Sequence, residues 1–347
     1  MTTTEHSQAY CGSKHTARRT LSLLTALGLL MSGPAPSAAR VANPFATDDQ
    51  PATNETTDTT DGPARVRRLT FQYTAHDGRT SVVYVALPAW YRPDRNPTIP
   101  LVIAPHGRNA TAKSMLARFG NLPAIGAFVL VSPETQGRRT ELYPWGYRRT
   151  IDDIARMPEL LADALPWLRI DPTRIYAFGT SMGGQEVLLL AALHPHLLAG
   201  VAAFDSTVDF GLQYRNFAKI EDGRKLQRLA RAEVGGTPTT APTAYSERSP
   251  MTYTRELAHS GVRFQIWWTP RDEVVIQPGR QSRALVVSLT AMNPEIALDA
   301  FTGRWQHAKS MRADHVLPMA LARFGLLPKE FGKAPIRFHV AEVAAAQ

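Results

Sequence analysis

The sequence is almost without cysteine, and its N-terminal apolar stretch is too short to cross a bilayer as a helix. Among 347 residues there is 1 cysteine, Cys11. Leu21 to Met31 falls well below the roughly 20 apolar residues that a transmembrane helix needs. If the N-terminal 39 residues are removed as an export signal, the remaining chain holds no cysteine. This excludes disulfides, a thiol nucleophile and a cysteine-bound metal. Such a protein depends on a large hydrophobic core.

The N-terminal residues resemble an export signal. Arg18 and Arg19 precede Leu21 to Met31, and Ser37-Ala38-Ala39 offers small residues for cleavage. We therefore expect residues 1–39 to be a secretory signal peptide cut near Ala39, and the mature protein to be secreted or periplasmic without stable membrane insertion. An N-terminal membrane anchor is the alternative that the short apolar stretch disfavours. The arginine pair also suggests twin-arginine export, although Ala17 stands where that signal prefers Ser or Thr.

The charge is basic but dispersed. The formal net charge is +9, and no basic stripe interleaved with aromatic residues occurs along the chain. This excludes a nucleic-acid-binding surface of the usual kind and favours a solvated surface, one that would suit anionic cell-envelope polymers. With 44% hydrophobic residues, the chain as a whole is not disordered. The sequence does not indicate an oligomeric state.

Apolar segments alternate with helical ones from residue 65 onward. Residues 68–73 and 81–87 predict an antiparallel pair around the turn Asp77-Gly78. Short apolar runs that predict buried strands follow at 101–104, 127–131, 175–178, 200–204, 264–268 and 296–301. Strands that alternate with helices predict an α/β fold, a mostly parallel twisted sheet of about eight strands with helices on both faces.

The domain boundaries follow from composition. Residues 40–64, rich in Thr, Asp, Asn and Pro, are interpreted as a flexible linker. Residues 65–330 form the predicted α/β domain, and 331–347 a C-terminal tail. Within the domain, residues 209–250 lack the strand rhythm, and we interpret them as a lid insertion.

One serine lies between two glycines where a strand meets a helix. The segment "AFGTSMGGQEV", 177–187, carries Gly179, Ser181 and Gly183 directly after an apolar run. Strand, G-x-S-x-G and helix together are typical of a nucleophile elbow, whose sharp turn needs glycines on both sides. Ser181 is therefore the candidate nucleophile. The helix that begins near Met182 offers unpaired backbone N–H groups for a developing oxyanion.

A serine nucleophile needs a base and an acid that orients the base, in the chain order Ser, acid, His. Asp272 follows the apolar run 264–268 and is the preferred acid, while Asp205, after 200–204, is its rival. His307 follows the last predicted strand and is the preferred base. His315, near the start of the closing helix, is the alternative.

These motifs carry a resemblance to a known superfamily. "IDPTRIYAFGTSMGG", 170–184, and "PHG", 105–107, are similar to α/β-hydrolase serine hydrolases, in particular secreted esterases and the catalytic domain of prolyl-oligopeptidase-type peptidases. The resemblance covers residues 65 to about 327. In this fold the backbone N–H of Arg108, or of Gly107, would join that of Met182 in the oxyanion hole, with His106 shaping the loop.

The sequence thus predicts a secreted serine hydrolase that cleaves carboxylic esters of a small molecule or a polymer through an acyl-enzyme. The predicted triad is Ser181, His307 and Asp272, and no metal or organic cofactor is implied. A prolyl-oligopeptidase-type peptidase is the first alternative, and an acyltransferase of the cell envelope the second. A non-catalytic binding protein on the same fold is the alternative of another class. The sequence does not identify the substrate-binding residues.

Overall fold

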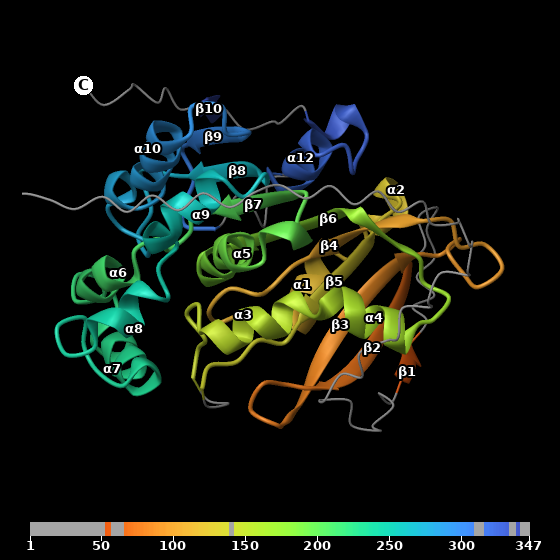
Figure 1. Cartoon of the computed structure of the whole chain (residues 1–347), viewed down its shortest axis with the longest axis horizontal. Coiled ribbons are helices and arrows are strands. Elements are labelled where there is room, and N and C mark those ends of the chain that lie inside the picture. The colour runs from red at the N-terminus through yellow and green to blue at the C-terminus, as the bar shows by residue number, and fades with distance from the viewer. Residues whose placement is uncertain (1–52, 57–65, 139–141, 309–315, 333–337, 341–347) are drawn as a thin grey trace, which may run out of the picture. The chain divides into compact units, whose positions relative to one another are not determined.

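The computed structural model describes residues 53–56, 66–138, 142–308, 316–332 and 338–340 as a mixed sheet flanked by helices (Figure 1). Within these described residues, the sheet has ten strands in the order β1-β2-β3-β5-β4-β6-β7-β8-β9-β10. The strands are β1 Thr53–Thr56, β2 Val66–Thr74, β3 Thr80–Pro88, β4 Ile99–Ile103, β5 Val129–Pro133, β6 Ile170–Thr180, β7 Gly200–Phe204, β8 Arg263–Trp268, β9 Leu298–Gly303 and β10 Phe338–Val340. The predicted signal peptide, residues 1–39, lies outside the described residues.

Strand direction divides the sheet into a parallel centre and antiparallel edges. Strands β5, β4, β6, β7, β8 and β9 pair in parallel, so their carboxyl ends meet at one edge. Strands β1, β2 and β3 are antiparallel neighbours, β3 pairs antiparallel with β5, and β10 pairs antiparallel with β9. The predicted mostly parallel sheet is confirmed, and β1 and β10 are added at its two ends.

Each face of the sheet carries its own helices and its own core. The helices are α1 Ala112–Phe119, α2 Pro123–Gly126, α3 Arg148–Ala155, α4 Met157–Ala164, α5 Met182–Leu193, α6 Phe210–Phe217, α7 Gly223–Val234, α8 Pro242–Ser246, α9 Thr254–Ala258, α10 Ser282–Met292 and α12 Val316–Arg323. Side chains of α3, α4, α5, α9 and α10 pack on one face, and those of α1 and α12 on the other. Along β4, Leu101 and Ile103 enter the first core and Val102 enters the second, as the twofold repeat of a strand requires.

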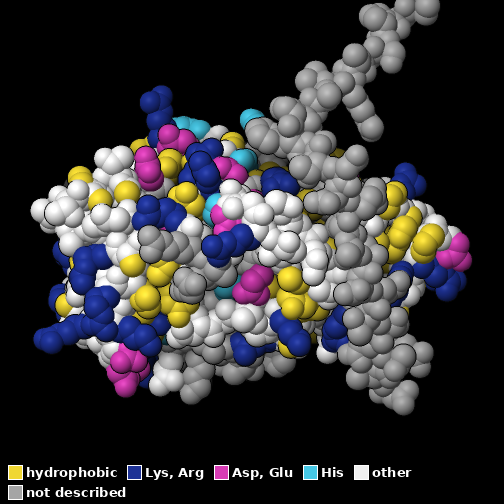
Figure 2. All heavy atoms as spheres, turned by 90° about the horizontal axis from the view of Figure 1, so that it is seen from below, with side chains coloured by type: hydrophobic (Ala, Val, Ile, Leu, Met, Phe, Trp, Pro, Cys, Tyr) yellow, Lys and Arg dark blue, Asp and Glu magenta, His cyan; other side chains and the backbone are white. Residues whose placement is uncertain are grey.

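Among the described residues, no helix combines the length and the apolar character that crossing a membrane would require. Lys and Arg side chains are spread over the face shown in Figure 2, with Asp and Glu between them. This matches the dispersed basic charge of the sequence.

Residues 209–250 contain helices and loops but no strand, and we call this segment the cap. It holds α6, α7 and α8, which stand beside the sheet in Figure 1. Phe210, Tyr214 and Tyr245 of the cap form a third apolar cluster with Trp145 and Met182. The cap therefore packs against the residue that follows Ser181.

Two short strands lie where the sequence predicted irregular chain. Thr53–Thr56, inside the predicted linker 40–64, pair with β2, and Phe338–Val340, inside the predicted tail 331–347, pair with β9. These pairs use backbone groups of sheet edges, which apolar patterning does not reveal. The last strand of the central sheet also extends to Gly303, two residues beyond the expected end.

Candidate active site

Ser181 has the backbone of a nucleophile elbow. It stands between β6 and α5 with φ 56° and ψ −117°, a conformation that costs free energy for a residue with a side chain. A Cβ on Gly179 would collide with the carbonyl oxygen of Gly183, and one on Gly183 would lie 2.7 Å from the carbonyl oxygen of Pro105. Only glycine fits at both positions, so the turn can be sharp enough to bring Ser181 to the first turn of α5.

The loop after β4 lies directly against this elbow. A Cβ on Gly107 would lie 3.3 Å from the Thr180 carbonyl oxygen and 4.0 Å from the Cβ of Ser181. His106 is buried below the loop, and its Nδ1 is 3.0 Å from the carbonyl oxygen of Gly107. Arg108 follows next, so the backbone that was expected to help bind an oxyanion runs alongside Ser181. Met182, at the first position of α5, has an N–H without an acceptor inside the helix.

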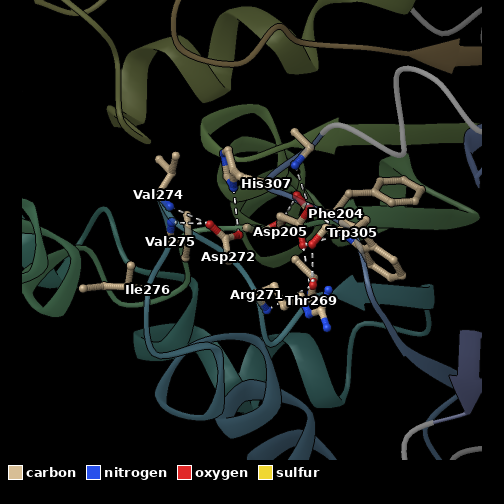
Figure 3. A network of polar contacts seen from close by, with 12 residues as sticks. Phe204, Asp205, Thr269, Arg271, Asp272, Val274, Val275, Ile276, Trp305 and His307 are labelled. Carbon is tan, nitrogen blue, oxygen red and sulfur yellow. Dashed lines mark hydrogen bonds and ion pairs between the residues drawn. The ribbon is translucent and has the colours of Figure 1, made fainter. Parts of the chain in front are cut away.

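Asp272 and His307 are in direct contact. His307 Nδ1 is 2.8 Å from Asp272 Oδ2 (Figure 3). The other carboxylate oxygen, Oδ1, accepts the backbone N–H groups of Val274 and Val275 at 2.8 and 2.7 Å. Asp272 is thereby held by its own loop, with one oxygen left for the imidazole. This is the arrangement in which a carboxylate fixes the orientation of a histidine base.

Asp205, the rival acid, bonds to other groups. Its carboxylate accepts the indole N–H of Trp305 and the backbone N–H groups of Thr269 and Ala308 (Figure 3). Burial raises the pKa of Asp205 to about 6, with the His307 charge lowering it and the Asp272 charge raising it. The imidazole of His307 therefore hydrogen-bonds to Asp272, whereas Asp205 accepts hydrogen bonds from the Trp305 indole and from backbone N–H groups of the neighbouring loops.

The predicted residues occupy the loops at one edge of the sheet. Ser181 follows β6, Asp205 follows β7, Asp272 follows β8 and His307 follows β9, and these strands are parallel neighbours. The backbone N–H of Ser181 donates to the carbonyl oxygen of Phe204, which fixes the elbow beside the loop of Asp205. We call these four loops the site edge. His315 lies outside the described residues.

Three possible metal donors meet at the site edge. One atom each of Asp205, Asp272 and His307 lies within 4.8 Å of the others. Their oxygens already accept N–H groups, and Nδ1 of His307 faces Asp272, so the cluster is a hydrogen-bonded unit. The sequence identified all three residues but not the bonds of Asp205 to Trp305 and Ala308, which are 100 and 103 positions away. The signal for Asp205 was its place directly after a buried strand.

Comparisons with known proteins agree with this geometry. No profile of a known protein family matches the sequence. The protein named "Putative esterase NocK", of Nocardia uniformis subsp. tsuyamanensis, is 33% identical over 109 residues, which are 30% of this chain and 32% of NocK. The chain thus spans about a third of the length of that relative.

Solved structures resemble the fold at low identity. Acetyl xylan esterase from Paenibacillus sp. R4 matches with a TM-score of 0.57 and 12% identity, covering 79% of this chain and 87% of that one. A puromycin-hydrolyzing peptidase of Mycobacterium tuberculosis matches at 0.56 and 18%, covering 72% and 37%. Pyrococcus horikoshii acylaminoacyl peptidase matches at 0.53 and 15%, covering 71% and 38%.

The strand order, the elbow and these matches define an α/β-hydrolase fold. As its motifs predicted, the chain shares this fold with the acylaminoacyl peptidase and the acetyl xylan esterase, and part of its sequence is similar to NocK.

Proposed function

We propose that the protein is a serine hydrolase that cleaves carboxylic esters through an acyl-enzyme. One observation carries the proposal: a serine in a strained elbow lies at the same sheet edge as a histidine bonded to a buried aspartate. The strained backbone of Ser181 does not improve packing. In a nucleophile elbow, such a turn projects the serine hydroxyl out from the carboxyl edge of the sheet.

In the proposed reaction, Ser181 Oγ attacks the ester carbonyl while His307 Nε2 accepts the hydroxyl proton. The N–H groups of Met182 and Arg108 stabilise the oxyanion of the tetrahedral intermediate. His307 then gives the proton to the departing alkoxide, which leaves as an alcohol. Water attacks the acyl-enzyme in the same way, and the carboxylic acid is released. Asp272 keeps the imidazole in the required tautomer and stabilises its charged form.

The choice of esters over amides is supported by two of the matched proteins. NocK carries the name of an esterase, and the acetyl xylan esterase is matched over 87% of its chain. The peptidases are matched over 37% and 38% of theirs. A serine peptidase with the same catalytic residues is the second candidate, supported by the fold matches to the two peptidases.

The test is a set of substrates that share one acyl group. The purified chain is assayed on an alkyl ester, an aryl ester and the corresponding amide, with Ser181→Ala as the control for background. The proposal expects both esters to be hydrolysed and the amide to be a far poorer substrate by kcat/KM. Faster cleavage of a peptide amide than of the alkyl ester would assign the peptidase instead.

The cap is proposed as a lid that shapes the acyl-binding site. Its aromatic residues pack with Met182 and Trp145, next to the nucleophile. Apolar and aromatic side chains around a few polar groups are what a small-molecule site needs. Trp145, which is 3% exposed, would then form the wall between the cap and the elbow.

Action outside the cytoplasm is also part of the proposal, because residues 1–39 have the pattern of an export signal. Expression in a bacterial host followed by fractionation and N-terminal sequencing tests it. We expect a mature chain that begins near Arg40 in the extracytoplasmic fraction. A chain that keeps its first 39 residues in the cytoplasm would contradict the expectation.

A further inference from the structure

Asp205 is a buried carboxylate that the proposed reaction does not use. It follows β7 directly, is 2% exposed, and has φ 44°, a left-handed backbone conformation. Its own backbone N–H donates to the carbonyl oxygen of Trp267 in β8. Burying a carboxylate is costly unless hydrogen bonds compensate for the lost water. The partners of this carboxylate therefore indicate its role.

Those partners belong to two different loops. Oδ1 accepts the backbone N–H of Thr269 at 3.1 Å, in the loop that leads from β8 to Asp272. Oδ2 accepts the backbone N–H of Ala308 at 2.9 Å, and the indole N–H of Trp305 lies 3.0 Å from the same oxygen. Trp305 and Ala308 flank His307 on both sides. One carboxylate thus holds the loop of the acid and the loop of the base (Figure 3).

A second bond closes the link between the two loops. Thr269 Oγ1 donates to the carbonyl oxygen of Trp305 at 2.7 Å and accepts the backbone N–H of Arg271 at 3.1 Å. The Trp305 side chain is 7% exposed and packs over Gly303, where a Cβ would meet its ring. The positions of Asp272 and His307 relative to each other therefore depend on Asp205 through several short bonds.

Asp205 also lies close to the acid and the base themselves. Its carboxylate lies within the 4.8 Å cluster that contains Asp272 and His307. Both groups affect the pKa of Asp205: the His307 charge lowers it and the Asp272 charge raises it. The carboxylate of Asp205 thus lies beside the two residues whose loops it holds.

We propose that Asp205 is a positioning residue: through its hydrogen bonds it holds the loop of Asp272 and the loop of His307 in a fixed position relative to each other. This inference rests on the proposed serine hydrolase function. It assigns to Asp205 a role distinct from that of the triad acid, which stays with Asp272.

The test compares Asp205→Asn with Trp305→Phe in the full chain, on an ester that the wild type hydrolyses. An asparagine keeps the size of the side chain but removes the charge, and its NH₂ group must face an N–H donor. We expect kcat to fall on the order of 10²-fold with little change in KM, as for small misplacements of catalytic groups. Trp305→Phe keeps a buried ring and loses one donor, so its kcat should fall less.

The split between kcat and KM separates positioning from a general loss of structure. A lower kcat at unchanged KM, in a variant that unfolds at the same urea concentration as the wild type, is the result expected of a positioning residue. Wild-type kcat in folded Asp205→Asn would overturn the inference. So would a loss as large as that of Asp272→Asn, because Asp205 would then be the acid itself.

Folding and function are checked in parallel. If Asp205→Asn unfolds, Trp305→Phe carries the test of positioning, and a kcat equal to that of the wild type in the folded variant overturns it. Activity retained in Ser181→Ala would instead refute the proposed function. The two failures are therefore distinguishable.

Discussion

Both the site edge and the cap bury carboxylates, but the partners of these carboxylates differ. At the site edge, Asp205 and Asp272 accept N–H groups from loops and face a histidine. In the cap, Glu233 of α7 is fully buried and forms an ion pair with Arg248, whose Nη2 is 3.0 Å away. The same carboxylate also accepts the backbone N–H of Arg138 from outside the cap.

The difference separates two uses of a buried charge. The carboxylates of the site edge orient groups that can react, so their loss should affect turnover more than folding. The cap carboxylate joins a helix to the adjoining chain, since Arg248 also donates to the carbonyl oxygen of Pro144. Its loss should affect folding more than turnover. The predictions below test this division, from the largest expected effect to the smallest.

The largest effect is expected from the base at the site edge. His307→Ala should lower kcat on an activated ester on the order of 10³-fold or more, because the serine proton loses its acceptor. His315→Ala should stay near the wild type. His196→Ala, a change at an exposed histidine, is the matched control and should be neutral. A dead His315→Ala beside an active His307→Ala would reverse the assignment.

In the cap, Glu233→Ala should lower the free energy of unfolding by about 3–5 kcal/mol, because Arg248 is left buried and unpaired. Urea unfolding measures the loss, and the kcat of the folded fraction should remain within a few-fold of the wild type. The double change Glu233→Met with Arg248→Met should recover much of the stability. A fall in kcat without a loss of stability would show that Glu233 and Arg248 act in turnover, as the carboxylates of the site edge are expected to do.

The strand positions and the site edge could be predicted from sequence because both follow local rules. Apolar runs marked β4 to β9 within a few residues, and the carboxyl ends of parallel strands share an edge, so Ser181, Asp272 and His307 could be assigned together. The cap contacts could not be predicted in this way. Glu233 and Arg138 are 95 positions apart, and no periodicity links them. The edge strand at Thr53–Thr56 depends on backbone pairing with β2, for which the polar sequence gives no apolar pattern.

A further buried carboxylate, Glu186 of α5, has no hydrogen-bond partner for either oxygen among the described residues. Burial raises its pKa from 4.5 to about 8, although His106 acts in the opposite direction. Between these values the folded protein holds a proton that the unfolded chain has lost, so stability falls as the pH rises through this window.

Replacement by a neutral amide removes this dependence on pH. From pH 4.5 to 8 the wild type should lose on the order of 4 kcal/mol of unfolding free energy relative to Glu186→Gln. Chemical unfolding of both proteins at several pH values measures the difference, and Glu247→Gln, at an exposed residue, serves as the control. Parallel curves for the wild type and Glu186→Gln would refute a proton on Glu186.

The smallest effect on the fold is expected when α7 is replaced by a short Gly-Ser linker together with Arg248→Met. The buried side chains of α7 belong to the third apolar cluster and not to the two cores on the faces of the sheet, so the sheet should stay folded and the melting temperature should fall less than after loss of a residue of those two cores. The preference between long and short acyl esters should change about 10-fold if the cap lines the acyl site. An unfolded product would show that the cap is part of the core.

The central claim, that Ser181 is the nucleophile at the site edge, is tested most directly by covalent labelling with a fluorophosphonate probe. Peptide mapping should locate the label on Ser181 in the wild type and in Ser206→Ala, which changes a buried serine in the neighbouring loop. Ser181→Ala should remain unlabelled and folded. Equal labelling of the wild type and Ser181→Ala would contradict the account.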